Sequence, residues 1–186
     1  MQDAICELAA GGGGTPGPPG PPGPQGDPGP PGPPGPAASV AYGAFHSNSD
    51  LVTTINTPTP IPVEVTDLSA GVTVVANTQV TVTTAGVYNL QFSSQLHHRG
   101  GGGSGETVDI WLAVNGSAVA DTTTRLTVPN SRFLVAAWNF FVQLAAGDHA
   151  ELIYHTDNAN IVLEHLPVGL VIPAVPSTIL TMTQVA

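Results

Sequence analysis

Histidine is the residue type that comes closest to forming a chemical site in this sequence. Two of the six histidines, His97 and His98, are adjacent and are followed by Arg99 and a run of glycines. Imidazole nitrogens bind zinc, but neighbouring side chains on a strand point to opposite faces, so these two are poorly placed to share one ion. A ring of one histidine from each of three chains is an alternative. We interpret the segment as an exposed polar loop and predict no bound metal.

A second group of potential ligands lies nearer the end of the chain. Asp157, Asn158 and Asn160 carry oxygen atoms of the kind that bind calcium, but their spacing is not that of an EF-hand. The sequence contains no nucleophile elbow, phosphate-binding loop or zinc-protease motif. We therefore assign no catalytic residue and no cofactor, and we predict that the chain is not an enzyme.

The charge composition argues against some classes of binding partner. The chain has no lysine, and its Lys and Arg total of 3 faces 13 acidic residues, which gives a net charge of −10 at pH 7. Binding to a phosphate backbone or to anionic lipid requires clustered basic residues. No stretch approaches the roughly 20 apolar residues of a membrane span. We expect neither a nucleic-acid nor a membrane partner.

The first residues read as a short leading segment over 1–13. They lack the basic start and the apolar run of a secretory signal peptide, so we expect a protein made in the cytoplasm. A small apolar cluster, Ile5, Cys6 and Leu8, is interpreted as a docking peptide, with a disordered tail as the alternative. Because Cys6 is the single cysteine, no disulfide can form within one chain.

Residues 14–37 carry a strict period of three. Glycine stands at every third position of this segment, and most of the remaining positions are proline: Gly14, Gly17, Gly20, Gly23, Gly26, Gly29, Gly32 and Gly35. Three polyproline-type chains wind together only where glycine occupies the shared axis. A flexible linker has a similar composition but no such phase. The segment is predicted to be a collagen-like stalk, which makes the protein a homotrimer.

From residue 38 onward the sequence changes to short alternating segments separated by Gly, Pro, Asn and Asp, the pattern of β-strands and turns. No segment has a sustained helical period. The candidate strands are 41–46, 51–55, 61–65, 72–75, 78–83, 86–98, 106–115, 118–126, 132–144, 149–156, 160–165 and 177–185. The sequence predicts an all-β head over 38–186.

One of these strands, 132–144, is apolar on both faces. Its first face carries Leu134, Ala136, Trp138, Phe140, Val142 and Leu144, and its second carries Phe133, Val135, Ala137 and Phe141. In an antiparallel sandwich only one face of a strand meets the core. We expect the second face to lie at a subunit interface.

Two segments of the head resemble C1q-like and tumour-necrosis-factor-like domains. They are Val80-Thr-Val-Thr-Thr-Ala-Gly-Val-Tyr-Asn-Leu-Gln-Phe and Leu144-Ala-Ala-Gly-Asp-His-Ala-Glu-Leu. The resemblance covers 38–186 and implies a jelly-roll sandwich that forms a compact homotrimer. The ending from Pro176 lacks the Phe- and Gly-rich character of animal C1q heads. With its stalk, the chain looks more like the collagen-like, jelly-roll fibre proteins of bacteriophages.

This resemblance implies a structural virion protein, a trimeric capsid (head) fibre or decoration protein whose N-terminus docks on a capsid or tail protein. The head would make weak contacts with the host or its surroundings, including host-surface glycans. The candidate contact residues at its tip are His97, His98, Arg99 and Trp111. A tail fibre or receptor-binding protein, a bacterial collagen-like spore or cell-surface filament, and a secreted animal recognition module are the alternatives.

Overall fold

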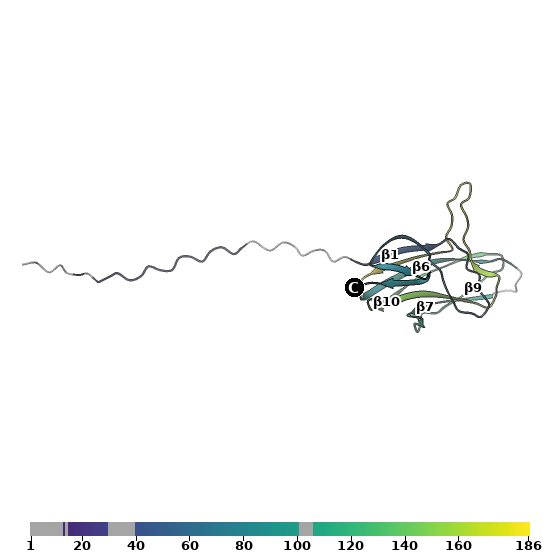
Figure 1. Cartoon of the computed structure of the whole chain (residues 1–186), viewed down its shortest axis with the longest axis horizontal. Helices are drawn as coiled ribbons and strands as arrows, with labels where there is room; N and C mark the ends of the chain where they lie inside the picture. Colours follow the sequence, from purple (N-terminus) through teal and green to yellow (C-terminus); the bar gives the residue numbers. More distant parts are fainter. Residues whose placement is uncertain (1–12, 14, 30–39, 101–105) are drawn as a thin grey trace, which may run out of the picture. The chain divides into compact units, whose positions relative to one another are not determined.

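The computed structural model describes residues 13, 15–29, 40–100 and 106–186 (Figure 1). The chain divides into two units, Met1–Ala37 and Ala38–Ala186. In the first unit, residues 15–29 are exposed and form no helix or strand. Of the predicted stalk and docking residues, six lie outside the described residues: Ile5, Cys6, Leu8, Gly14, Gly32 and Gly35.

The second unit contains two antiparallel sheets. In the first, here called sheet A, the strand order is β10-β6-β13-β1-β3, and β12 pairs with β6. Its strands are β1 (Tyr42–Ser47), β3 (Val65–Ala70), β6 (Gly86–His98), β10 (Phe133–Leu144), β12 (Ile161–Leu163) and β13 (Thr178–Gln184). The two longest strands, β6 and β10, are paired along their length, from Phe133 opposite His97 to Leu144 opposite Gly86.

The second sheet, sheet B, has the order β4-β5-β11-β7-β8, with β2 paired to β11 and β9 paired to β7. Its strands are β2 (Thr59–Pro60), β4 (Val72–Val75), β5 (Gln79–Val82), β7 (Glu106–Val114), β8 (Ser117–Ala118), β9 (Thr124–Val128) and β11 (His149–Thr156). None of the described residues is helical, and none of them belongs to a helix that could cross a membrane. The predicted all-β head is confirmed.

The core lies between the two sheets and is built by period-two alternation. Leu90 and Leu96 of β6 are fully buried, as are Val108 and Ile110 of β7. The buried Tyr154 hydroxyl is satisfied within the sandwich, because it donates to the Ile161 carbonyl at 2.7 Å. Even-numbered side chains of β7 and β11 face the core, as Val108 and Tyr154 do. The odd-numbered side chains of these strands therefore lie on the outer face of sheet B.

Three predicted strands differ in the structure. Residues 51–55 form only an isolated bridge at Leu51, and 61–65 is replaced by β2 and β3 on either side of it. Proline at position 62 has no N–H for a ladder, which explains the interruption. The predicted strand 118–126 is divided into β8 and β9 because Asp121 adopts a left-handed backbone conformation with φ of 60°.

Part of the connection between β12 and β13, residues 166–175, projects from the body of the head (Figure 1). Leu166 and Val175 close its base by donating backbone hydrogen bonds to each other at 2.9 and 2.8 Å. At its tip, Leu170 is 107% and Val171 93% exposed. We call residues 166–175 the apolar finger; this segment lies between the two predicted strands 160–165 and 177–185.

Candidate interaction sites

Arg99 and His97 are engaged in ion pairs within the head. The Arg99 guanidinium contacts Asp50 at 2.5 Å and Glu164 at 2.9 Å, and His97 Nδ1 lies 2.5 Å from the same glutamate. The His97 ring also stacks on Phe133, with ring centroids 4.0 Å apart. These two predicted contact residues therefore join β6 to neighbouring segments of their own chain.

We call the group formed by Asp50, His97, Arg99 and Glu164 the Arg99 cluster. Within it, the Asp50 carboxylate has two partners. Its Oδ1 accepts the His165 backbone N–H at 2.8 Å, and its Oδ2 faces Arg99. Burial raises the pKa of Asp50, but the His165 amide and the Arg99 guanidinium outweigh burial and hold that pKa below its ordinary value. The carboxylate stays charged at neutral pH and fixes the loop after β1 against the segment after β12.

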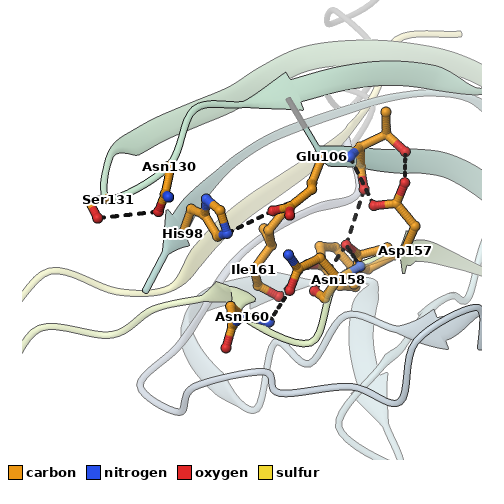
Figure 2. Close-up of polar contacts among 11 residues, drawn as sticks. His98, Glu106, Asn130, Ser131, Asp157, Asn158, Asn160 and Ile161 are labelled. Atoms are coloured by element: carbon orange, nitrogen blue, oxygen red, sulfur yellow. Dashed lines mark hydrogen bonds and ion pairs between the residues drawn. The ribbon is translucent and has the colours of Figure 1, made fainter. Parts of the chain in front are cut away.

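His98 is placed differently from the adjacent histidine. Its side chain is fully buried, and its Nε2 lies 2.8 Å from Glu106 Oε2, as Figure 2 shows. The two rings point to opposite faces of β6, as the alternation of a strand requires. A buried side chain is not available to a partner, so the prediction of His98 as a tip contact does not fit its position.

The predicted oxygen ligands near the end of the chain are used in internal hydrogen bonds (Figure 2). Asp157 accepts from the Thr107 backbone N–H at 3.0 Å and from the Thr107 hydroxyl at 2.9 Å, and Asn158 Oδ1 accepts the Asn160 N–H at 2.7 Å. Burial raises the pKa of Asp157, but the bonds from Thr107 outweigh it and lower that pKa. Within the described ranges, no three His, Cys, Asp or Glu side chains form a group that could hold a metal.

Trp111 lies on the outer face of sheet B, on the rim of a pocket of about 320 Å³. The floor of this pocket is buried and is formed by Ala113, Glu151 and Ile153. Two strand pairings place these residues, since Ile153 lies opposite Trp111 and Glu151 lies opposite Ala113. We call this site the Trp111 pocket.

The walls of the Trp111 pocket come from segments on two sides of β7 and β11. On one side are Pro58 and Pro60, where β2 pairs with β11. On the other are Gly116 and Ala118 of the hairpin that joins β7 to β8, which turns at Asn115 and Gly116 with φ values of 50° and 77°. The predicted contact residue Trp111 thus lines a pocket.

The outer face of sheet A exposes large apolar side chains. On β10, Phe141 is 66%, Val135 57% and Phe133 49% exposed, and Ile179 of the neighbouring region on β13 is 46% exposed. The opposite face of β10 packs on the core through Trp138 and Phe140. The predicted apolar character of both faces of this strand is confirmed, and its second face is open in the single chain.

The fold of the head is found in known protein structures. The head is similar to the globular domain of zebrafish complement 1qA protein, with a TM-score of 0.54 and 12% identity over 80% of this chain and 98% of that chain. It has a C1q/TNF-like jelly-roll fold. The Eiger TNF of S. frugiperda matches with a TM-score of 0.47 and 14% identity over 79% of this chain and 93% of that one. No family model and no curated protein sequence matches the chain.

Proposed function

We propose that the chain is a homotrimeric structural fibre protein of a bacteriophage particle, attached through its first residues and presenting its jelly-roll head outward. C1q/TNF-like domains are typically binding or structural domains, so the head is proposed to act by contact and not by catalysis. The observation that carries the proposal is the unbroken glycine period of residues 14–37 in front of a C1q/TNF-like head.

The glycine spacing of the stalk supports a trimer, because packing within a single chain does not explain it. Glycine recurs at every third position, yet a Cβ added at Gly17, Gly20, Gly23, Gly26 or Gly29 would meet nothing within 4 Å in the single chain. Nothing inside one chain therefore requires glycine at these positions. A collagen helix does, because three chains meet at its axis and leave no room for a side chain.

The outer face of sheet A supports the same assembly for the head. Phe141, Val135 and Ile179 lie on one sheet face and together form the kind of apolar surface that monomeric proteins rarely leave in water. A threefold arrangement of heads would cover this face while leaving sheet B accessible. Eight triplets are a short collagen helix, so the head is proposed to hold the three chains in register.

The place on a virion is proposed from the combination of a collagen-like stalk and a jelly-roll head, which resembles bacteriophage fibre proteins. A capsid (head) location is proposed, with a tail location as the alternative. Three identical heads on one stalk would give avidity to contacts that are individually weak.

Two measurements test the proposal. Sedimentation equilibrium of the full chain should give the mass of a trimer and sedimentation velocity an elongated particle; a compact monomer would remove the fibre assignment. Immunogold electron microscopy with an antibody to the head should label phage capsids. Label at a tail tip would indicate a receptor-binding fibre, and label only on spores or cells would overturn the virion assignment.

A further inference from the structure

The Trp111 pocket combines one carboxylate with one aromatic ring on an otherwise apolar lining. Glu151 is the diagonal neighbour of Trp111 across β7 and β11, and side chains in this relation are separated by about 7–8 Å at the backbone, within reach of a shared ligand. Glu151 is 7% and Ile153 8% exposed, whereas Pro58 and Pro60 at the rim are exposed. The site is thus a small recess with its single charge at the bottom.

Within the described part of the chain, the Glu151 carboxylate has one hydrogen-bond donor, so it keeps further acceptor capacity. Its Oε1 accepts the Thr78 hydroxyl at 2.7 Å. Its Oε2 lies 3.8 Å from His149 Nε2, beyond the usual hydrogen-bond length of about 2.7–3.2 Å. An ionised carboxylate accepts up to about four hydrogen bonds, so a donor that enters the pocket would find lone pairs available.

Among the residues that the structure describes, no arginine pairs with the Glu151 carboxylate, and its ion-pair partner is the His149 ring at 3.8 Å. Arg125 donates from Nε and from its terminal nitrogen to the two oxygens of Asp109, at 2.7 and 2.9 Å. His155 Nδ1 faces the same aspartate at 3.3 Å. The chain has no lysine, and its net charge is −10. Burying a charge without a compensating partner is costly, so the pocket electrostatically favours a positive ligand.

We propose that the Trp111 pocket binds a cationic amine, with the ammonium group held between the indole of Trp111 and the carboxylate of Glu151. Aromatic rings attract cations through their faces, and a carboxylate attracts any cation by its charge. Where the ammonium carries N–H groups, as in an amino sugar but not in choline, the carboxylate also accepts charge-assisted hydrogen bonds. Apolar substituents of the ligand would lie against Ile153 and the rim prolines. At about 320 Å³ the pocket fits a group of the size of choline or one amino-sugar ring.

This inference names a site for the adhesive part of the proposed function and depends on that function only for its setting. The pocket opens on sheet B, whereas the surface proposed to join the three chains is the outer face of sheet A. Each head of a trimer would therefore present an open pocket. An amine-bearing polymer on a cell surface would be held by three sites at once.

Tryptophan fluorescence gives a direct test because the chain contains 2 tryptophans, Trp111 and Trp138. Trp138 packs edge-on against Phe92 in the sandwich, with centroids 4.6 Å apart, so Trp138→Phe leaves Trp111 as the sole indole with little change of packing. This full-length variant is titrated with choline, glucosamine and N-acetylglucosamine at pH 6 and low salt. We expect saturable changes with choline and glucosamine, at least tenfold weaker binding of N-acetylglucosamine, and weaker cation binding at high salt.

Replacement of the carboxylate tests its charge. Glu151→Gln in the same background keeps the side-chain shape and should lower the affinity for choline at least tenfold. Asp67→Asn, which removes an equal charge from β3 of sheet A, should change that affinity less than twofold. Should Glu151→Gln fail to fold, Trp111→Leu in the wild-type chain, followed by calorimetry with choline, should lose binding.

Three results would overturn the proposal: no saturable response to either cation, unchanged affinity in Glu151→Gln, or equal binding of N-acetylglucosamine, which would indicate a neutral-sugar site. Sedimentation of the same samples keeps the two proposals separate. A trimer that binds no cation would remove this inference and leave the fibre, whereas a monomer that binds choline would do the reverse.

Discussion

His98 Nε2 lies 2.8 Å from Glu106 Oε2, and this contact joins the last residue of β6 to the first residue of β7 across the glycine-rich segment 99–105. The histidine is 0% and the glutamate 20% exposed. Glycine-rich connections lose much backbone entropy on ordering, so a contact at their two ends is well placed to keep the adjoining strands aligned.

Removing the Glu106 carboxylate should destabilise the head. Glu106→Ala leaves the buried His98 imidazole without this partner, and we expect a loss of about 1–3 kcal/mol in the free energy of unfolding, measured with urea. Asp67→Asn is the matched control because Asp67 pairs with His46 at 3.1 Å on an exposed surface. That change should cost less than about 0.5 kcal/mol. Equal losses in the two variants would contradict the role given to burial.

The head should lose stability in acid. Hydrogen bonds from Arg125 lower the pKa of Asp109, and the Asn115 amide together with the Ala145 N–H lowers that of Asp148. A carboxyl whose pKa is lower in the folded chain stabilises the fold above the ordinary aspartate pKa of about 4 and stops doing so as the pH falls through its folded value. The urea concentration at the midpoint of unfolding should therefore decrease as the pH is lowered from 5 to 2, because these carboxylates become protonated.

Asp109→Asn removes one of these titrating groups, so its stability should depend less steeply on pH over the same acid range. Asp121→Asn removes the same charge at an exposed turn and is the control for the change in net charge. An unchanged slope in Asp109→Asn would show that the Arg125 contact is not maintained in solution.

Gly43→Ala should overpack the core. An added Cβ would collide with the ring of Phe45, which is 0% exposed and has no room to move. We expect a destabilisation of about 1–3 kcal/mol by urea unfolding. The double variant with Phe45→Leu should be less destabilised than the sum of the two single changes, because the smaller side chain makes room for the new methyl group. Strict additivity would exclude this collision as the cause.

Phe141→Asp should shift the proposed trimer toward monomer. Phe141 is 66% exposed on the outer face of sheet A, and a charge there would be buried if that face joins the subunits. Val75→Asp is the control, since Val75 is 51% exposed on β4 of sheet B. Sedimentation equilibrium distinguishes the two. A Phe141→Asp protein that stays fully trimeric would exclude this face as the interface.

The tip of the apolar finger should contribute little to folding. Leu170 and Val171 are almost fully exposed, so replacing both with serine should change the free energy of unfolding by less than about 0.5 kcal/mol. The variant should elute earlier from a hydrophobic interaction column, because it removes apolar surface from water contact. A loss of stability above about 1 kcal/mol would mean that the finger packs on the head in solution.

The strands that the sequence predicted well are those in which apolar and polar residues alternate along the strand itself. In β6, β7 and β11 one face is buried along most of the length, and in β10 one face is buried or half-buried. This periodicity is visible in the residue types alone. β3 was missed because it is an edge strand, paired with β1, whose residues are almost all exposed, so Asp67 and Ser69 interrupt any apolar pattern. An edge strand is held by backbone hydrogen bonds to its neighbour, and these leave no pattern in the types of its side chains.

The Trp111 pocket and the Arg99 cluster could not be assembled from sequence for a related reason. Arg99 meets carboxylates that lie 49 and 65 residues away, and the pocket joins Pro60 to Ile153 through the pairing of β2 with β11. Trp111 was predicted as a contact residue, but its partnership with Glu151 depends on strand register. Register between distant strands is fixed by the whole sandwich and has no local signature.

The closed base of the apolar finger makes the head a scaffold for peptide display. Leu166 and Val175 hold the two ends of the loop together by backbone hydrogen bonds, which are indifferent to the side chains between them. None of the residues from Val168 to Ile172 belongs to the buried core. A foreign epitope grafted between these ends would meet the tolerance that exposed loop tips have for insertion. On a threefold assembly it would be shown to an antibody in triplicate, without redesign of the sandwich beneath it.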